Sequence, residues 1–118
     1  MKKLTRFSFG ETGIFHALPL LEDFLDSGDY EDMKWAEGQF DQFLTIPKIV
    51  KEEKTISFFT SKGLKKFQEA LDILRDLFYQ IEESGVGIFL KEEVKYEDIK
   101  PLILYEDEYQ VIIKKEGN

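Results

Sequence analysis

The strongest pattern of hydrophobic positions lies between residues 64 and 81, where apolar residues recur at intervals of three and four. This spacing places them on one face of an α-helix. The positions are Leu64, Phe67, Leu71, Leu74, Phe78 and Ile81. Thr60 or Ser61 is a suitable N-cap before the pattern, and Gly85 is a suitable residue just past its end. We therefore expect a long amphipathic helix that forms the centre of the core.

A second helical pattern covers residues 14–25, whose apolar positions form a wide stripe. Pro19 lies inside this stripe, so the helix either begins near Leu18, with the proline in its first turn, or kinks at that point. Ser27 and Gly28 are typical of a helix end. We expect a helix that ends at these two residues.

Short stretches in which apolar and polar residues alternate predict strands. The expected strands cover residues 5–9, 40–45, 49–51, 54–59, 86–90, 102–105 and 109–114. The polar residues 51–54 predict the turn of a hairpin, and Pro47 predicts an edge or a bend. Residues 96–100 predict one helical turn, and residues 30–37 predict either a short helix or an ordered loop.

The length of 118 residues is typical of one domain. Strands occur at both ends of the chain and around two main helices, without the regular alternation that predicts a parallel sheet. We expect a single α+β domain over residues 1–118, in which an antiparallel or mixed sheet packs against two main helices.

Several classes of chemistry have no support in the sequence. The chain has no cysteine and one histidine, His16, which excludes thiol chemistry and a typical zinc site. No nucleophile motif accompanies His16, so a structural role is favoured for it. Residues 26–32 place glycine third, where a calcium loop needs it sixth, so only a weak nonspecific cation site remains conceivable there. We expect no catalytic residues, no metal site and no cofactor.

The pair Gly85 and Gly87 is the closest approach to a phosphate-binding loop. It lacks the lysine and the helix that follow such a loop, so a turn before a strand is favoured. The N-terminus lacks the apolar run of a signal peptide, and no stretch has the roughly 20 apolar residues that a membrane helix needs. We expect a soluble cytoplasmic protein.

The charge is large and unevenly distributed. The net charge is −8, and residues 22–41 contain eight acids against the single base Lys34, whereas residues 42–66 contain six lysines against two acids. The eight acids are Glu22, Asp23, Asp26, Asp29, Glu31, Asp32, Glu37 and Asp41. Nucleic acids and anionic lipids repel such a surface, so direct binding to either is disfavoured. A basic protein is the expected partner, because an acidic patch raises its rate of encounter.

Two large aromatic residues, Tyr30 and Trp35, lie inside this acidic segment, and aromatic anchors among charges are typical of binding hot spots. The alternative is that Trp35 caps the core and that the acids only face solvent. The candidate contact residues here are Asp23, Asp26, Asp29, Tyr30, Glu31, Asp32 and Trp35.

A second candidate contact lies between the last two expected strands, where Glu106, Asp107 and Glu108 are adjacent. As structure, this triplet predicts the tip of a hairpin, where charge stays hydrated. No glycine favours a tight two-residue turn, so a four-residue loop or a bulge is equally compatible. As function, three acids between Tyr105 and Tyr109 form a compact negative contact point. The two interpretations are compatible with each other.

The segments FFTSKGLKKF (residues 58–67) and ILYEDEYQV (residues 103–111) resemble the small acidic immunity proteins that accompany bacterial polymorphic or contact-dependent toxins. Many of these toxins carry a nuclease domain. The resemblance implies a non-enzymatic inhibitor that binds its toxin in the cytoplasm. The acidic segment independently favours a basic toxin, because a nuclease needs positive charge to hold phosphates. The leading hypothesis is an immunity protein that covers the active-site or substrate-binding face of such a toxin.

Two other functions are compatible with the same sequence. An acidic nucleic-acid mimic or adaptor that inhibits a DNA- or RNA-binding protein would use the same electrostatics. A small enzyme would need a cleft with perturbed titratable groups. The oligomeric state stays open.

Overall fold

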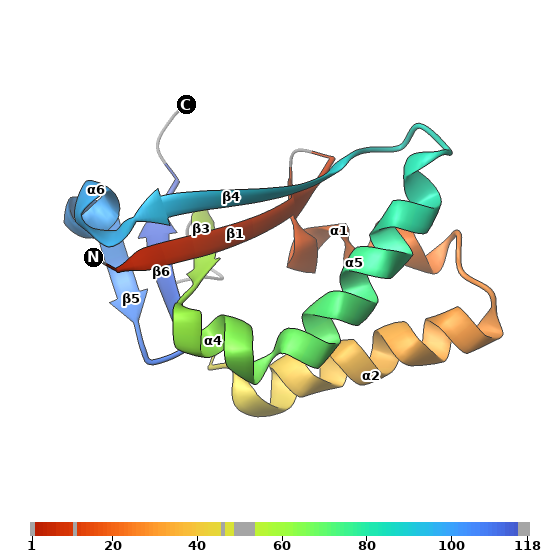
Figure 1. The fold of residues 1–118 in the computed structure, drawn as a ribbon, viewed down its shortest axis with the longest axis horizontal. Coiled ribbons are helices and arrows are strands. Elements are labelled where there is room, and N and C mark those ends of the chain that lie inside the picture. The colour runs from red at the N-terminus through yellow and green to blue at the C-terminus, as the bar shows by residue number, and fades with distance from the viewer. Residues whose placement is uncertain (1, 11, 46, 49–53, 116–118) are drawn as a thin grey trace. The chain divides into compact units, whose positions relative to one another are not determined.

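The computed structural model describes residues 2–10, 12–45, 47–48 and 54–115 and shows an α+β fold, as expected from the sequence (Figure 1). The helices are α1 (Ile14–Glu22), α2 (Ser27–Phe43), α4 (Ser61–Lys66), α5 (Gln68–Glu82) and α6 (Tyr96–Ile99), followed by the 3-10 turn η1 (Lys100–Leu102). The strands are β1 (Lys3–Phe9), β2 (Thr12–Gly13), β3 (Thr55–Phe59), β4 (Phe89–Lys95), β5 (Ile103–Glu106) and β6 (Gln110–Lys114).

In the described residues, the strands form one sheet with the order β2-β1-β3-β6-β5, and β4 pairs with β1. The pairs of β1 with β2, β1 with β3, β3 with β6 and β5 with β6 are antiparallel. Phe58 lies opposite Val111 in the β3–β6 ladder. The strands expected over residues 5–9, 54–59, 102–105 and 109–114 are therefore confirmed within a residue or two.

The chain divides into two compact units. The sheet unit comprises Met1–Arg6, Thr45–Lys66 and Glu92–Asn118, and the helical unit comprises Phe7–Leu44 and Phe67–Lys91. The boundary between them falls within β1 and within β4. A single domain over residues 1–118 stays a prediction.

The core of the helical unit consists mainly of phenylalanine rings. Phe9 and Phe78 stack with their centroids 4.8 Å apart, and Phe40 and Phe67 stack at 4.9 Å. Phe9, Phe67 and Phe78 are almost completely buried. Large aromatic side chains bury much apolar surface each, so these contacts hold β1, α2 and α5 together.

The core of the sheet unit is mainly aliphatic. Its buried members are Leu4, Phe58, Ile99, Val111 and Ile113. They come from β1, β3, α6 and β6, so the last third of the chain folds back onto the first strand.

The helix boundaries near Pro19 differ from the expectation. Helix α1 begins at Ile14, contains Pro19, and already ends at Glu22. Ser27 and Gly28 do not end it. They are the first residues of α2, because Asp26 caps that helix by accepting a hydrogen bond from the Asp29 N–H at 2.8 Å.

Helix α2 is the largest correction. Residues 30–37 are helical, which was one of the two expectations, but the helix is much longer and replaces the strand expected at residues 40–45. Met33, Ala36 and Phe40 are its buried residues, at intervals of three and four. Three apolar contacts in 17 residues give a weak pattern, and the surrounding acids and glycines obscured it. The strand piece at residues 49–51, and the turn at residues 51–54 except Lys54, lie outside the described residues.

The long helix expected after Thr60 is interrupted at Phe67, which separates α4 from α5. Thr60 does cap α4, since its Oγ1 accepts a hydrogen bond from the Gly63 N–H at 3.0 Å. Gly85 adopts a left-handed backbone with φ of 82° shortly after α5, as expected. The strand expected at residues 86–90 begins only at Phe89 and continues to Lys95. The helical turn expected at residues 96–100 is confirmed as α6 and η1.

Candidate protein-binding surfaces

Two of the acids in residues 22–41, which we call the acidic segment, support the fold of α2. Asp26 is its N-cap, and Asp29 lies in its first turn. Negative charge near a helix N-terminus is favourable, because it interacts with the exposed N–H groups and the helix dipole. These two candidate contact residues therefore have a structural role whether or not they also bind a partner.

Tyr30 and Trp35 both belong to α2, but they lie on different sides of it. Five residues along a helix correspond to a rotation of roughly 140°. The exposed fractions of Tyr30 and Trp35 are 38% and 44%. Both side chains are thus exposed to solvent, and a single small contact area cannot centre on both aromatic rings.

The Tyr30 side of α2 holds the only base of the acidic segment. The Lys34 Nζ lies 3.4 Å from Glu37 Oε1, 3.7 Å from Glu22 Oε1 and 5.5 Å from the centroid of the Tyr30 ring. Glu37, followed by Tyr30 and Glu22, raises the pKa of Lys34 above its ordinary value. The positive charge of Lys34 is therefore compensated locally, and the segment presents an acidic surface.

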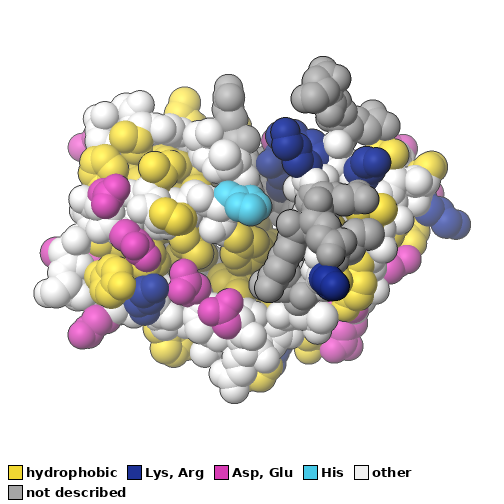
Figure 2. Space-filling model, turned by 180° about the vertical axis from the view of Figure 1, so that it is seen from behind, with side chains coloured by type: hydrophobic (Ala, Val, Ile, Leu, Met, Phe, Trp, Pro, Cys, Tyr) yellow, Lys and Arg dark blue, Asp and Glu magenta, His cyan; other side chains and the backbone are white. Residues whose placement is uncertain are grey.

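The Trp35 side combines an aromatic ring with acids. Glu31 and Asp32 precede Trp35 by four and three residues, a spacing that places side chains on neighbouring positions of a helix surface. All three are exposed. On the face shown in Figure 2, acidic side chains are interspersed with exposed hydrophobic ones. Such a mixture of an apolar anchor and a charged rim is typical of protein interfaces.

The connection between α1 and α2 contains a third exposed aromatic residue, Phe24, which belongs to the apolar stripe expected over residues 14–25. Phe24 is 47% exposed and follows Asp23, the C-cap residue of α1. Its exposure follows from the early end of α1, which takes Phe24 out of the helix. In the sequence, the position of Phe24 between Asp23 and Asp26 was the one indication that its side chain is exposed. Asp23 lies at the negative end of the α1 dipole, where an acid is unfavourable.

The hairpin between β5 and β6 explains the three adjacent acids of the sheet unit. Asp107 folds the loop: its Oδ1 accepts hydrogen bonds from the backbone N–H groups of Tyr109 and Gln110, at 2.9 and 3.0 Å. Its Oδ2 accepts a hydrogen bond from the Tyr105 hydroxyl at 2.8 Å. The Asp107 N–H in turn donates to the Gln110 carbonyl at 2.9 Å. The carboxylate thus stabilises a turn that contains no glycine.

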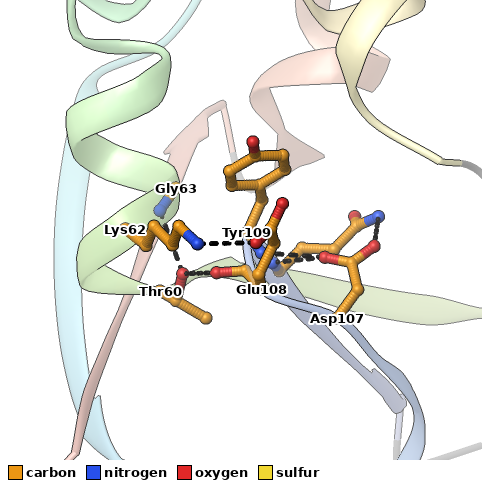
Figure 3. Close-up of polar contacts among 7 residues, drawn as sticks. Thr60, Lys62, Gly63, Asp107, Glu108 and Tyr109 are labelled. Atoms are coloured by element: carbon orange, nitrogen blue, oxygen red, sulfur yellow. Dashed lines mark hydrogen bonds and ion pairs between the residues drawn. The ribbon is translucent and has the colours of Figure 1, made fainter.

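Glu108 joins this loop to the start of α4, as Figure 3 shows. Its Oε2 lies 2.6 Å from the Lys62 Nζ, and its carbonyl oxygen accepts a hydrogen bond of 2.6 Å from the Thr60 hydroxyl. Glu106 accepts a hydrogen bond from the Tyr96 hydroxyl at 2.9 Å. Each acid of the triplet therefore has its own partner within the sheet unit. The three carboxylates are bound by three different side chains.

Gly63 allows α4 to approach the hairpin closely. A Cβ at this position would lie 2.1 Å from the Tyr109 carbonyl oxygen and 2.9 Å from its carbonyl carbon. Neither distance is compatible with a side chain, and both partners are backbone atoms that cannot rotate away. A residue without a side chain is thus required at position 63 for this contact.

The hydrogen bonds of the tip shift its titration. Burial tends to raise the pKa of Asp107, but the hydrogen bonds from Tyr109, Tyr105 and Gln110 outweigh this effect and hold the pKa below its ordinary value. The hydrogen bond from Lys62 lowers the pKa of Glu108. The hydrogen bond to Asp107 raises the pKa of the Tyr105 hydroxyl. The native hairpin therefore favours ionised acids and a neutral Tyr105.

The remaining candidates from the sequence have simple surroundings. His16 lies exposed on α1 (Figure 2). Gly87 belongs to a close backbone contact, because a Cβ there would lie 2.9 Å from the Cα and N atoms of Gly10. In the part of the chain that the structure describes, no three His, Cys, Asp or Glu residues are placed to hold a metal ion. Among the same residues, no helix combines the length and the apolar character needed to cross a membrane.

Comparison with known proteins found no family model, no curated protein and no solved structure that matches the chain. The functional argument therefore rests on the geometry of two acidic regions. The acidic segment belongs to the helical unit, and the hairpin tip at residues 106–108 belongs to the sheet unit.

Proposed function

We propose that the protein is an immunity protein, which binds a cognate basic toxin in the cytoplasm and neutralises it by covering its active-site or substrate-binding face. A toxin with a nuclease domain fits best, since a nuclease must present positive charge to hold phosphate groups. In this proposal the protein acts by occupying a surface and catalyses no reaction.

One observation carries the proposal. The acidic segment exposes three aromatic side chains, Phe24, Tyr30 and Trp35, among its carboxylates, and the one base within the segment, Lys34, is already paired. Large aromatic side chains that stay exposed among charges favour a role in binding. The surrounding carboxylates favour a cationic partner and restrict the choice of partner.

The charges and the aromatic rings are expected to act on different steps of binding. Exposed charges at the rim of an interface mainly raise the association rate and make it depend on salt. Aromatic anchors that become desolvated mainly slow dissociation. The proposed complex is therefore formed quickly at low salt and is retained through Trp35 and its neighbours.

The decisive experiment is co-purification of the tagged protein with the product of the gene immediately upstream, followed by binding kinetics of the pair. We expect Glu31→Lys/Asp32→Lys to lower the association rate by about tenfold or more at low ionic strength. We expect Trp35→Ala to raise the dissociation rate by about 30-fold, the equivalent of about 2 kcal/mol.

Asp76→Lys/Glu83→Lys is the matched control, because it changes the net charge equally from exposed positions of the same unit outside the acidic segment. It should leave most of the association rate intact. Equal effects of the two double variants would show that only the net charge matters and would contradict the assigned surface. A partner that is a DNA- or RNA-binding protein without toxicity would favour the nucleic-acid mimic instead.

A further inference from the structure

Strand β4 leaves one edge of the sheet without a neighbouring strand among the described residues. It pairs with β1, and no other described strand pairs with it. Residues 90–93 are all exposed. Ile88 and Leu90, at its beginning, are 65% and 51% exposed, the highest fractions among the large hydrophobic residues of the described chain. An open edge with apolar residues is a template for pairing with another strand.

The sequence of β4 is complementary to itself when two copies run antiparallel. With the two-fold axis at Glu92, Lys91 of one copy lies opposite Glu93 of the other, and Leu90 lies opposite Val94. Each of these pairs occurs twice in a symmetric dimer. Opposite charges and apolar side chains that face each other across strands are stabilising.

Leu90 and Val94 lie on the same side of β4, because side chains two and four residues apart share one face of a strand. Val94 is half-buried against the aliphatic core of the sheet unit. Leu90 of a second copy would therefore extend an apolar surface that already exists, and it would become buried itself.

The only like-charge contact in this register is compensated within each chain. Glu92 would lie opposite Glu92 of the second copy, which is unfavourable on its own. However, the Arg6 Nη1 lies 3.8 Å from Glu92 Oε1. Two arginines thus accompany the two glutamates at the axis. Lys91 and Glu93 each have interactions within their own chain as well. In the dimer, the pairs between the two copies either add to these interactions or replace them.

We propose that β4 is the dimerisation edge of this protein, which pairs antiparallel with β4 of a second copy in the register centred on Glu92. The buried surface is that of one strand pair and a few side chains, so the dimer is weak and depends on concentration. This dimer does not depend on the proposed function, which involves the acidic segment.

Charge reversal tests both the dimer and its register. Lys91→Glu places a new glutamate opposite the native Glu93, and Glu93→Lys places a new lysine opposite the native Lys91, so either change creates two repulsive pairs in a homodimer. We expect each to weaken dimerisation by about tenfold or more, measured by sedimentation velocity over a concentration series. The double variant Lys91→Glu/Glu93→Lys restores opposite charges and should dimerise like the wild type.

Mixing the two single variants is the sharpest test, since each then meets its complement. In the heterodimer, the introduced glutamate of one chain faces the introduced lysine of the other, and the native Glu93 faces the native Lys91. The mixture should therefore associate although neither component does so alone. Circular dichroism of each variant checks that the fold is retained.

Two results would overturn the proposal. One is a wild-type protein that is monomeric at about 1 mM, and the other is a mixture of the single variants that fails to associate. In either case the charges of β4 would only protect an edge strand from aggregation.

Discussion

The acidic segment and the hairpin tip at residues 106–108 are both rich in carboxylates, but these carboxylates serve different ends. At the tip, each acid is bound by a side chain or backbone group of the same unit. In the acidic segment, Asp26 and Asp29 support the helix N-terminus, while Glu31 and Asp32 lie on the exposed Trp35 side of α2 and Asp23 lies at an unfavourable helix end. A high local density of acids therefore does not by itself indicate a binding surface. Acids that are already bound by groups of their own chain favour a structural role, whereas exposed acids beside an aromatic side chain favour a role in binding.

If internal contacts fix the hairpin tip, then Gly63→Ala is the change that should disturb the tip most. The new methyl group would overlap the Tyr109 backbone, so α4 and the hairpin must separate. We expect a loss of about 1–3 kcal/mol in the free energy of unfolding, measured by urea denaturation.

Gly38→Ala is the matched control for this change. Gly38 lies in the middle of α2, and, apart from its chain neighbours and the adjacent backbone of its own helix, no atom of the described residues lies within 4 Å of a Cβ built there. Alanine should stabilise the protein by about 0.5–1 kcal/mol, because glycine is a poor helix former. If Gly63→Ala were as stable as the wild type, the close contact between α4 and the hairpin would be wrong.

The internal role of Asp107 predicts a loss of stability that depends on pH. Asp107→Ala removes the acceptor of two backbone N–H groups and of the Tyr105 hydroxyl, and should cost about 1–3 kcal/mol in thermal or urea unfolding at neutral pH. Because the pKa of Asp107 is lower in the folded chain than in the unfolded one, the ionised group stabilises the fold. This stability is present above the unfolded pKa and is lost as the pH falls through the folded pKa.

Asp107→Asn separates the charge from the shape of the side chain. Its amide oxygen can still accept a hydrogen bond, but it does not titrate. The stability of this variant should fall less than that of the wild type between about pH 5 and pH 2. Glu108 contributes to the acid dependence in both proteins with the same sign, since Lys62 lowers its pKa. Parallel curves for the two proteins would remove Asp107 as the group responsible.

The smallest expected effect has the opposite sign and lies in the acidic segment. Asp23→Asn removes a negative charge from the C-terminal end of α1, so it should raise the melting temperature by roughly 2–4 °C. Asp29→Asn removes a favourable charge from the N-terminal end of α2 and should lower the melting temperature by a similar amount. A loss of stability in Asp23→Asn would mean that this acid also has an internal role, and the contrast with the tip would weaken.

The sequence predicted best those elements that have a dense apolar pattern. The stripe from Leu64 to Ile81 became α4 and α5, with a break at Phe67, and the β5–β6 hairpin followed from two apolar runs around Asp107. The full length of α2 was not predicted, because three buried residues in 17 leave the rest of its surface polar. Its start was also misplaced, because Ser27 and Gly28 fit a helix end and a helix start almost equally well.

For the candidate surfaces, the sequence identified the residues but not their roles. It selected Tyr30 and Trp35 together, although helical rotation separates their side chains. It assigned Phe24 to a buried stripe, and only the end of α1 at Glu22 exposes that ring. The roles of Glu106, Asp107 and Glu108 depend on Tyr96, Tyr105, Thr60 and Lys62, most of which are distant in the chain.

The order of the residues by itself determined the α+β class, the uneven charge and the apolar faces, because these depend on spacing and composition. Only the tertiary structure decided which acids are satisfied within the chain and which face solvent. The physical reason is that the role of a carboxylate depends on which groups donate hydrogen bonds to it and on how far water reaches it. For the Glu108 carboxylate at the hairpin tip the donor is Lys62, more than 40 positions away in the sequence.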